Sequence, residues 1–386
     1  MVQLPKNRIE LLQFFNEKLT GEYEHYLDTE RSKKDLGLVK TYLLEGNLDG
    51  PPDHGVVLNL LKKIGDSSDF LIEETKDELF FTLQKLGSSD SIHNKVFYLD
   101  ASEGRFWMLY TLAKVDQATD FITKITSFPD IDHAWFPSQT LEKLMQLGQP
   151  RGYGGSFTNA PVLKNYSASQ REELLSQFSM KLWGNLGDEF LETIKSSQKL
   201  RDHFSFSNTR IKYKIGGQES AETVTDDWYY YGKVVSVGSS FNAHLNLVNK
   251  VFLENYKKII TEKIEGDLAI NFVSPDGKFV QINGEPILIK FQGQIDLQIF
   301  IKSVFDGSKP FRLLGFPLVE KNDFVRISAV DLHIGEPLTF DLRPNSIEIY
   351  LPEGTCGNTV ARFLALFQRH FVATSNALGK NYEELF

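Results

Sequence analysis

The stretch IEIYLPEGTCGNTVARFLALFQRHF, residues 347–371, indicates how this chain is built. It starts with the alternating apolar and polar residues of a strand, passes through a glycine-containing turn, and continues as an amphipathic helix. The polar residues Arg362, Gln368 and Arg369 fall mostly away from the apolar face of that helix. The apolar face consists of Val360, Phe363, Leu364, Phe367 and Phe371.

The order strand, short polar turn, amphipathic helix recurs along the chain. It is found in RFWMLYTL to TDFITKI, SMKLWG to DEFLETI, GKVVSV to FNAHLNLVNKVF, and PILIKF to DLQIFIKSVF. Segments without a helical pattern, such as FSFSNTRIKYKI, predict antiparallel hairpins. The sequence therefore predicts an α+β fold with mixed or antiparallel sheets and several strand-turn-helix units, for which ferredoxin-like layering is one arrangement. A long helix is predicted from Phe241 to about Ile264.

The length of 386 residues exceeds that of one ordinary domain and predicts two or three. Two segments rich in turn residues, 149–169 and SPDG at 274–277, mark boundaries. We therefore expect an acidic N-terminal α+β domain over 1–150 and a central α+β domain over 151–273, which holds a basic strand and the long helix. A C-terminal α+β domain over 274–386 ends in the amphipathic helix.

Charge and composition restrict the function classes. The net charge is −9, with −8 in residues 1–150 and −1 in residues 151–386, which argues against a broad nucleic-acid surface on the N-terminal part. No apolar run reaches the ~18 residues of a membrane span, so no membrane partner is expected. One cysteine excludes a disulfide framework and a multi-cysteine zinc site. We expect a cytoplasmic protein without a metal or cofactor.

Cys356 is the first candidate for chemistry. It lies where the last predicted helix begins, and a helix N-terminus favours a thiolate. A nucleophile also needs a base, which His333 could supply through a tertiary contact. His370 follows Cys356 by about four helical turns, ~20 Å along the helix. The alternative is a small buried residue in a tight turn, with Thr355 or Asn358 capping the helix.

Asp331 and His333 lie in VRISAVDLHIGEPLTFDLRPNSIEIYLPEG. Three strands followed by a helix resemble the opening of a ribonuclease H-like domain, whose first strand carries a metal-binding aspartate. The resemblance covers about 60 residues and implies that Asp331 would take that place in a two-metal nuclease, but the remaining carboxylates do not follow. The alternative places Asp331 and His333 on the solvent side of a strand.

A basic segment occupies residues 195–214, with six basic residues and one acidic residue. Side chains two residues apart share a face of a strand, which predicts Arg210, Lys212 and Lys214 on one side. The segment could bind an anion, a nucleic-acid backbone or an acidic partner; it could also be a solvated edge strand, or pair across a hairpin with acidic residues. The candidate binding residues are Lys195, Lys199, Arg201, Arg210, Lys212 and Lys214; the acidic residues are Glu219, Glu222, Asp226 and Asp227.

No combination of nucleophile, base and metal ligands typical of an enzyme stands out in the sequence. We therefore expect a binding protein with a protein partner, acting as a non-catalytic subunit of a larger assembly. One alternative is a Cys/His hydrolase that uses Cys356. A second alternative is a nucleic-acid-binding module that uses the basic segment 195–214.

Overall fold

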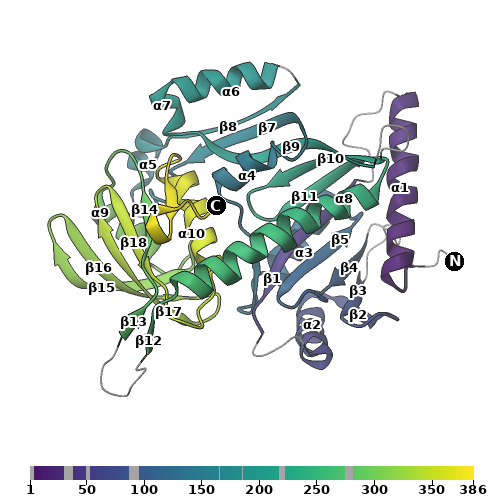
Figure 1. Ribbon diagram of the computed structural model, residues 1–386, viewed down its shortest axis with the longest axis horizontal. Helices are drawn as coiled ribbons and strands as arrows, with labels where there is room; N and C mark the ends of the chain where they lie inside the picture. The colour runs from purple at the N-terminus through teal and green to yellow at the C-terminus, as the bar shows by residue number, and fades with distance from the viewer. Residues whose placement is uncertain are drawn as a thin grey trace. The chain divides into compact units, whose positions relative to one another are not determined.

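The chain forms two compact units (Figure 1). The computed structural model describes residues 4–29, 38–48, 53–86, 95–164, 166–184, 186–216, 222–273 and 281–386. Unit 1 comprises Met1–Ala134, Met145–Pro150 and Arg210–Glu254, and unit 2 comprises Trp135–Leu144, Arg151–Thr209 and Asn255–Phe386. Helices combine with antiparallel sheets, which confirms the α+β class. None of the helices in the described ranges is long and apolar enough to cross a membrane.

One limit between the two units lies between Pro150 and Arg151, and the division into three domains stays a prediction. The chain passes from one unit to the other within strands β7 (Gln149–Thr158) and β9 (Ser205–Ile215). The expected boundary at 274–277 lies outside the described residues.

Unit 1 is organised around an antiparallel sheet with the strand order β2-β3-β4-β5-β1-β11-β10-β9, in which β6 also pairs with β1. Strands β2 to β5 follow one another along the chain and are neighbours in this sheet. The elements are α1 (Arg8–Thr29), β1 (Val39–Gly46), α2 (His54–Ser68), β2 (Phe70–Glu74), β3 (Phe80–Lys85), β4 (Val96–Asp100), β5 (Phe106–Thr111), α3 (Val115–Ile125), β6 (Ile131–His133), β10 (Glu222–Tyr229), β11 (Lys233–Gly238) and α8 (Phe241–Val248).

Apolar side chains cover both faces of the unit 1 sheet. On one face Tyr42 and Trp107 belong to a core that includes residues of α2 and α3. On the other face Phe15 of α1 packs against Tyr98 of β4 and Phe241 of α8. Strand β1 lies between β5 and β11, and all of its residues are buried. A strand enclosed on both faces needs a partner for every polar side chain that it carries.

Unit 2 contains a six-stranded antiparallel sheet with the order β15-β16-β17-β18-β14-β19, together with the β7–β8 hairpin and the β12–β13 pair. Its further elements are α4 (Ser138–Leu144), α5 (Ala168–Leu174), β8 (Gln177–Trp183), α6 (Leu186–Ser196), α7 (Gln198–Arg201), β12 (Asn271–Val273), β13 (Gln281–Asn283), β14 (Ile287–Lys290), α9 (Leu297–Val304), β15 (Leu313–Lys321), β16 (Phe324–Asp331), β17 (Glu336–Arg343), β18 (Ser346–Tyr350), α10 (Asn358–His370), β19 (Asn376–Leu378) and a 3-10 turn, η5 (Lys380–Tyr382).

Helix α10 belongs to the core of unit 2, as the apolar face of its sequence predicts. Phe363 stacks on Phe367 and contacts Phe340 of β17, with ring centroids 5.9 and 5.3 Å apart respectively. Phe367 also meets Phe300 of α9 at 5.8 Å. Arg362 and Gln368, expected to face away from the core, are buried as well. The helix is therefore enclosed on more than its apolar face, and its polar residues need partners inside the protein.

The long helix expected from Phe241 is present and continues to Leu268. It begins as α8, where the side chain of Ser240 accepts a hydrogen bond from the Ala243 amide and caps the helix. Two π-helical stretches follow, η3 (Asn249–Tyr256) and η4 (Ile259–Leu268). The helical pattern thus predicted the helix but not its π-helical stretches.

Candidate ligand-binding pocket

Cys356 lies at the beginning of α10 and is 3% exposed. Glu265 of η4 accepts a hydrogen bond from the next amide, that of Gly357, at 2.6 Å. A carboxylate therefore occupies the helix N-terminus that would otherwise favour a thiolate. Gly357 is the N-cap, and neither Thr355 nor Asn358 caps the helix as expected. The geometry agrees with the buried, structural alternative for Cys356.

His370 is at the opposite end of α10 and is not placed to act on Cys356. Its Nδ1–H donates to the carbonyl oxygen of Thr158 at 2.8 Å. Burial is the main cause that lowers the pKa of His370 to about 4, because a charged imidazole loses its hydration inside the protein. His370 is therefore neutral over the physiological pH range and serves the packing of unit 2.

Asp331 ends β16 and is fully buried, as is the nearby His333. The expectation of a solvent-facing pair is therefore wrong. One carboxylate oxygen of Asp331 accepts from Arg362 at 2.5 Å and from the His333 amide at 2.9 Å, and the other accepts from the hydroxyl of Thr359. Both oxygens are occupied by donors of the protein. Asp331 thus ties β16 to α10 and does not present a metal ligand.

No group of three or more His, Cys, Asp or Glu residues in the described ranges is arranged to hold a metal ion. One further polar cluster lies in unit 1, where His244 of α8 contacts Thr41 of β1 through Nε2 and Asp226 of β10 through Nδ1, both at 2.8 Å. Ser236 of β11 contacts the same Nδ1 at 2.8 Å. All four side chains are fully buried. The cluster holds α8 against three strands and offers no access to a substrate.

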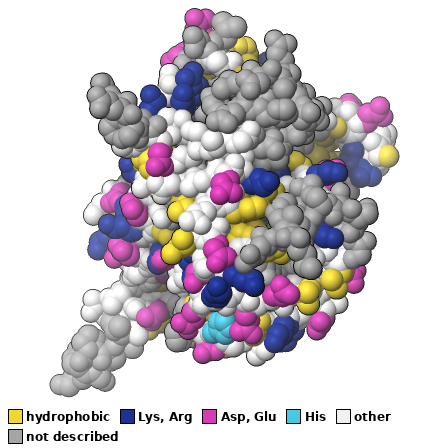
Figure 2. All heavy atoms as spheres, turned by 90° about the vertical axis from the view of Figure 1, so that its right-hand side faces the viewer, with side chains coloured by type: hydrophobic (Ala, Val, Ile, Leu, Met, Phe, Trp, Pro, Cys, Tyr) yellow, Lys and Arg dark blue, Asp and Glu magenta, His cyan; other side chains and the backbone are white. Residues whose placement is uncertain are grey.

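The six basic residues of the segment 195–214 fall into two groups. Arg210, Lys212 and Lys214 belong to unit 1, whereas Lys195, Lys199 and Arg201 belong to unit 2. Burial does not alternate regularly along β9, and Arg210 forms a two-pronged ion pair with Asp227 of β10. This contact agrees with the alternative of hairpin pairing; Glu219 lies outside the described residues. On the face drawn in Figure 2, acidic and basic side chains are intermixed.

Helices α6 and α7 carry the three basic residues of unit 2. Lys195 forms an ion pair with Glu142 of α4 at 2.7 Å. Lys199 and Arg201 are exposed, and within the described ranges they form no ion pair. These two cations are therefore available to a negatively charged group from outside the chain.

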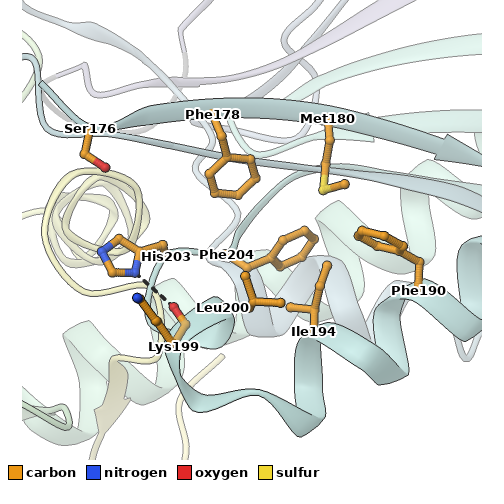
Figure 3. A pocket seen from close by; sticks show the side chains of 9 residues that line it. All are labelled: Ser176, Phe178, Met180, Phe190, Ile194, Lys199, Leu200, His203 and Phe204. Atoms are coloured by element: carbon orange, nitrogen blue, oxygen red, sulfur yellow. Dashed lines mark hydrogen bonds between the residues drawn. The ribbon is translucent and has the colours of Figure 1, made fainter.

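A pocket of about 430 Å³ opens beside Lys199, between β8 and the α6–α7 segment (Figure 3). Burial alternates along β8, so Phe178 and Met180 share the inner side of the strand. Phe190 and Ile194 of α6 are four residues apart and face them from the helix. Figure 3 shows these four side chains pointing toward one another across the gap. The lining residues are Ser176, Phe178, Met180, Phe190, Ile194, Lys199, Leu200, His203 and Phe204.

The two ends of the pocket differ in chemistry. Aromatic and aliphatic side chains line most of it, and Phe190 and Leu200 remain 42% and 49% exposed. Ser176, Lys199 and His203 gather at the other end (Figure 3). The Nδ1–H of His203 donates to the Lys199 carbonyl at 3.1 Å, which orients the ring. The pocket can therefore take a group with an apolar body and a negative charge near it.

The sequence indicates Lys199 and Arg201 as candidate binding residues, but it does not predict the pocket that Lys199 lines. The alternation in QFSMKLW predicts a half-buried strand, and Phe190 and Ile194 show helical spacing. Neither pattern shows that the strand and the helix leave a gap between them. The gap depends on how α6 packs over the β7–β8 hairpin. In this contact Tyr153 of β7 accepts a hydrogen bond from the Leu191 amide of α6 at 3.0 Å.

Comparison with known proteins assigns a family. The family model described as MJECL33-like protein matches residues 1–386, and the chain belongs to this family. A relative from Methanocaldococcus jannaschii named "Uncharacterized protein MJECL33" is 28% identical over 399 residues, which cover 95% of this chain and 92% of the relative. No solved structure matches the chain.

Proposed function

We propose that this member of the MJECL33-like family is a binding protein and a non-catalytic part of a larger assembly. Its pocket between β8 and the α6–α7 segment would receive an apolar side chain from an acidic segment of a protein partner. The observation that carries the proposal is the exposed apolar lining next to Lys199, a cation that forms no ion pair within the described residues.

The apolar part of the pocket supplies affinity. Phe190 and Leu200 are 42% and 49% exposed, so part of their surface is in water until a partner covers it. Removal of apolar surface from water stabilises a complex by about 25 cal/mol per Å², or roughly 1.5–3 kcal/mol for a large side chain that becomes fully buried. The volume of about 430 Å³ is in the range of pockets that bind specific groups.

The cation at the pocket, Lys199, supplies specificity. Lys199 lines the pocket itself, and Arg201 is two residues further along the chain. Carboxylates next to the apolar anchor of a partner would meet Lys199, and exposed charge pairs of this kind accelerate association more than they strengthen the complex. Binding should therefore weaken as salt screens the charges.

A protein partner fits better than a nucleic acid. A nucleic-acid surface needs cations that follow the phosphate backbone. Here Arg210 is paired with Asp227, Lys195 is paired with Glu142, and the six basic residues are divided between the two units. The lining of the pocket is mostly aliphatic and aromatic, as in the central part of protein–protein interfaces.

The test uses three fluorescein-labelled hexapeptides: EDFLDE, the charge-reversed KRFLKR, and EDSSDE without apolar residues. Fluorescence anisotropy should show that EDFLDE binds with a Kd of roughly 10–100 µM, and at least tenfold more tightly than the other two. Leu200→Glu should abolish binding, because it places a negative charge in the apolar lining.

A matched control is Leu71→Glu on β2, since Leu71 is 43% exposed but lies in unit 1. This variant should bind EDFLDE like the unmodified protein. Equal affinity for the three peptides, or unchanged binding by Leu200→Glu, would contradict the proposed function.

A further inference from the structure

Lys40 is an unusual residue in the interior of unit 1. It lies in β1, which pairs with β5 on one side and with β11 on the other. The residue is only 4% exposed. A lysine in such a position normally has a carboxylate beside it, because the protein interior does not hydrate its charge.

Three buried carboxylates of the protein follow that rule. Within the described ranges Asp227 is paired with Arg210, Asp331 with Arg362, and Asp341 with Arg326. The ammonium of Lys40 donates to the carbonyl oxygen of Leu38 at 3.1 Å, and no described carboxylate accepts from it. A neutral carbonyl does not compensate a full positive charge. The position of Lys40 thus lacks an anion.

A second lysine lies close to Lys40. Lys40 is opposite Val235 and Tyr42 is opposite Lys233, which places Lys40 and Lys233 diagonally on the same face of two neighbouring strands. Lys233 is 7% exposed, and its ammonium lies over the ring of Tyr229 at 5.3 Å. Burial, and then the charge of Lys233, lower the pKa of Lys40 to about 8.

Tyr42 adds an unused donor on the same face. Its side chain is 1% exposed, and its hydroxyl makes no hydrogen bond to any group in the described part of the chain. A buried hydroxyl without a partner is costly and is explained most simply by a group that binds there. Its neighbour in the register is Lys233.

We propose that Lys40, Lys233 and the hydroxyl of Tyr42 form a binding site for a phosphate group. Two ammonium groups and one phenol offer donors only, which matches an oxyanion that has acceptors only. The ligand is either inorganic phosphate or the phosphate of a nucleotide. The site lies in unit 1 and is independent of the pocket in unit 2.

Thermal unfolding at pH 7 tests the site in sodium phosphate and in sodium chloride of equal ionic strength. A phosphate concentration a hundredfold above Kd should raise the Tm of the full chain by about 5–10 °C over chloride. A parallel titration with AMP distinguishes the source, since a nucleotide site gives the same shift at a lower concentration of AMP than of phosphate. No phosphate-specific shift with either ligand would overturn the proposal.

Variants of Lys40 and Tyr42 test whether the phosphate-dependent rise in Tm comes from this site. Lys40→Met should abolish the phosphate response, whereas the control Lys62→Met, at an exposed position of α2, should keep it. Tyr42→Phe tests the site even if Lys40→Met does not fold, because the change to phenylalanine removes one oxygen atom and preserves the ring. This variant should bind phosphate about tenfold more weakly by calorimetry. An unchanged response in Lys40→Met, or an unchanged Kd in Tyr42→Phe, would overturn the site.

Discussion

Replacement of Asp331 by asparagine tests whether this carboxylate is structural. The side chains of Asp331 and Arg362 are 0% and 1% exposed, and they form a charged hydrogen bond of 2.5 Å. Asparagine preserves the shape but removes the charge, so that Arg362 keeps a buried charge without its partner. Such a loss costs about 3–5 kcal/mol of the free energy of unfolding, a large fraction of the stability of a domain.

Hydrogen exchange resolved to peptides of β16 and α10 measures this loss where it occurs, because both elements are tied by the pair. A second change, Arg362→Met in the Asp331→Asn background, should restore most of the protection, since it removes the uncompensated charge. The control Asp296→Asn changes an exposed carboxylate at the N-cap of α9 and should cost less than about 1 kcal/mol. A loss below about 1 kcal/mol for Asp331→Asn would refute the structural role.

Three further outcomes are expected. His370 has a folded pKa of about 4, below that of the unfolded chain near 6.5, so stability should fall as pH falls from about 6.5 to 4. In His370→Gln, the pH-dependent change in the free energy of unfolding, measured by urea titrations, should be smaller by up to ~3 kcal/mol. An unchanged pH dependence would argue against the burial of His370 as its cause. Lys40 has a folded pKa of about 8 and an unfolded one near 10.5, so without a bound anion stability should rise with pH between these values. Urea titrations of Lys40→Met should lose that rise, and a persisting rise would assign it to another group. The thiol of Cys356 should react with a thiol reagent over hours in the native protein, and complete labelling within seconds at neutral pH would revive its role as a nucleophile.

The fold class could be predicted because the apolar residues of most helices and strands recur at the spacing typical of that element. Strand β1 is the exception, since the segment around it is charged and weakly patterned in the sequence. Its buried Lys40, Thr41 and Glu45 interrupt the apolar run that a central strand usually shows. The position of Thr41 is explained by its contact with His244, more than 200 residues later, and that of Glu45 by its ion pair with Arg105. Such contacts leave no local pattern.

The candidate sites were harder to predict than the fold. A helix N-terminus directed attention to Cys356, but the carboxylate of Glu265, which occupies it, comes from a distant helix. Asp331 lies on the buried face of β16, and the alternation of the strand does not reveal that Arg362 is its partner. Lys199 and Arg201 were identified by charge alone. Their significance depends on the neighbouring pocket, which arises from the packing of α6 over β8.

The most direct measurement of the proposed function is methyl NMR of the methionines during titration with EDFLDE. The chain has 4 methionines; Met180 lines the pocket, and Met108 is buried in unit 1. Met180→Leu assigns the signal. The expected result is a saturable shift of the Met180 methyl with an unchanged Met108 methyl, and no shift with EDSSDE. Binding of EDFLDE that leaves the Met180 signal in place, or the absence of binding, would contradict the assignment of this pocket as the partner site.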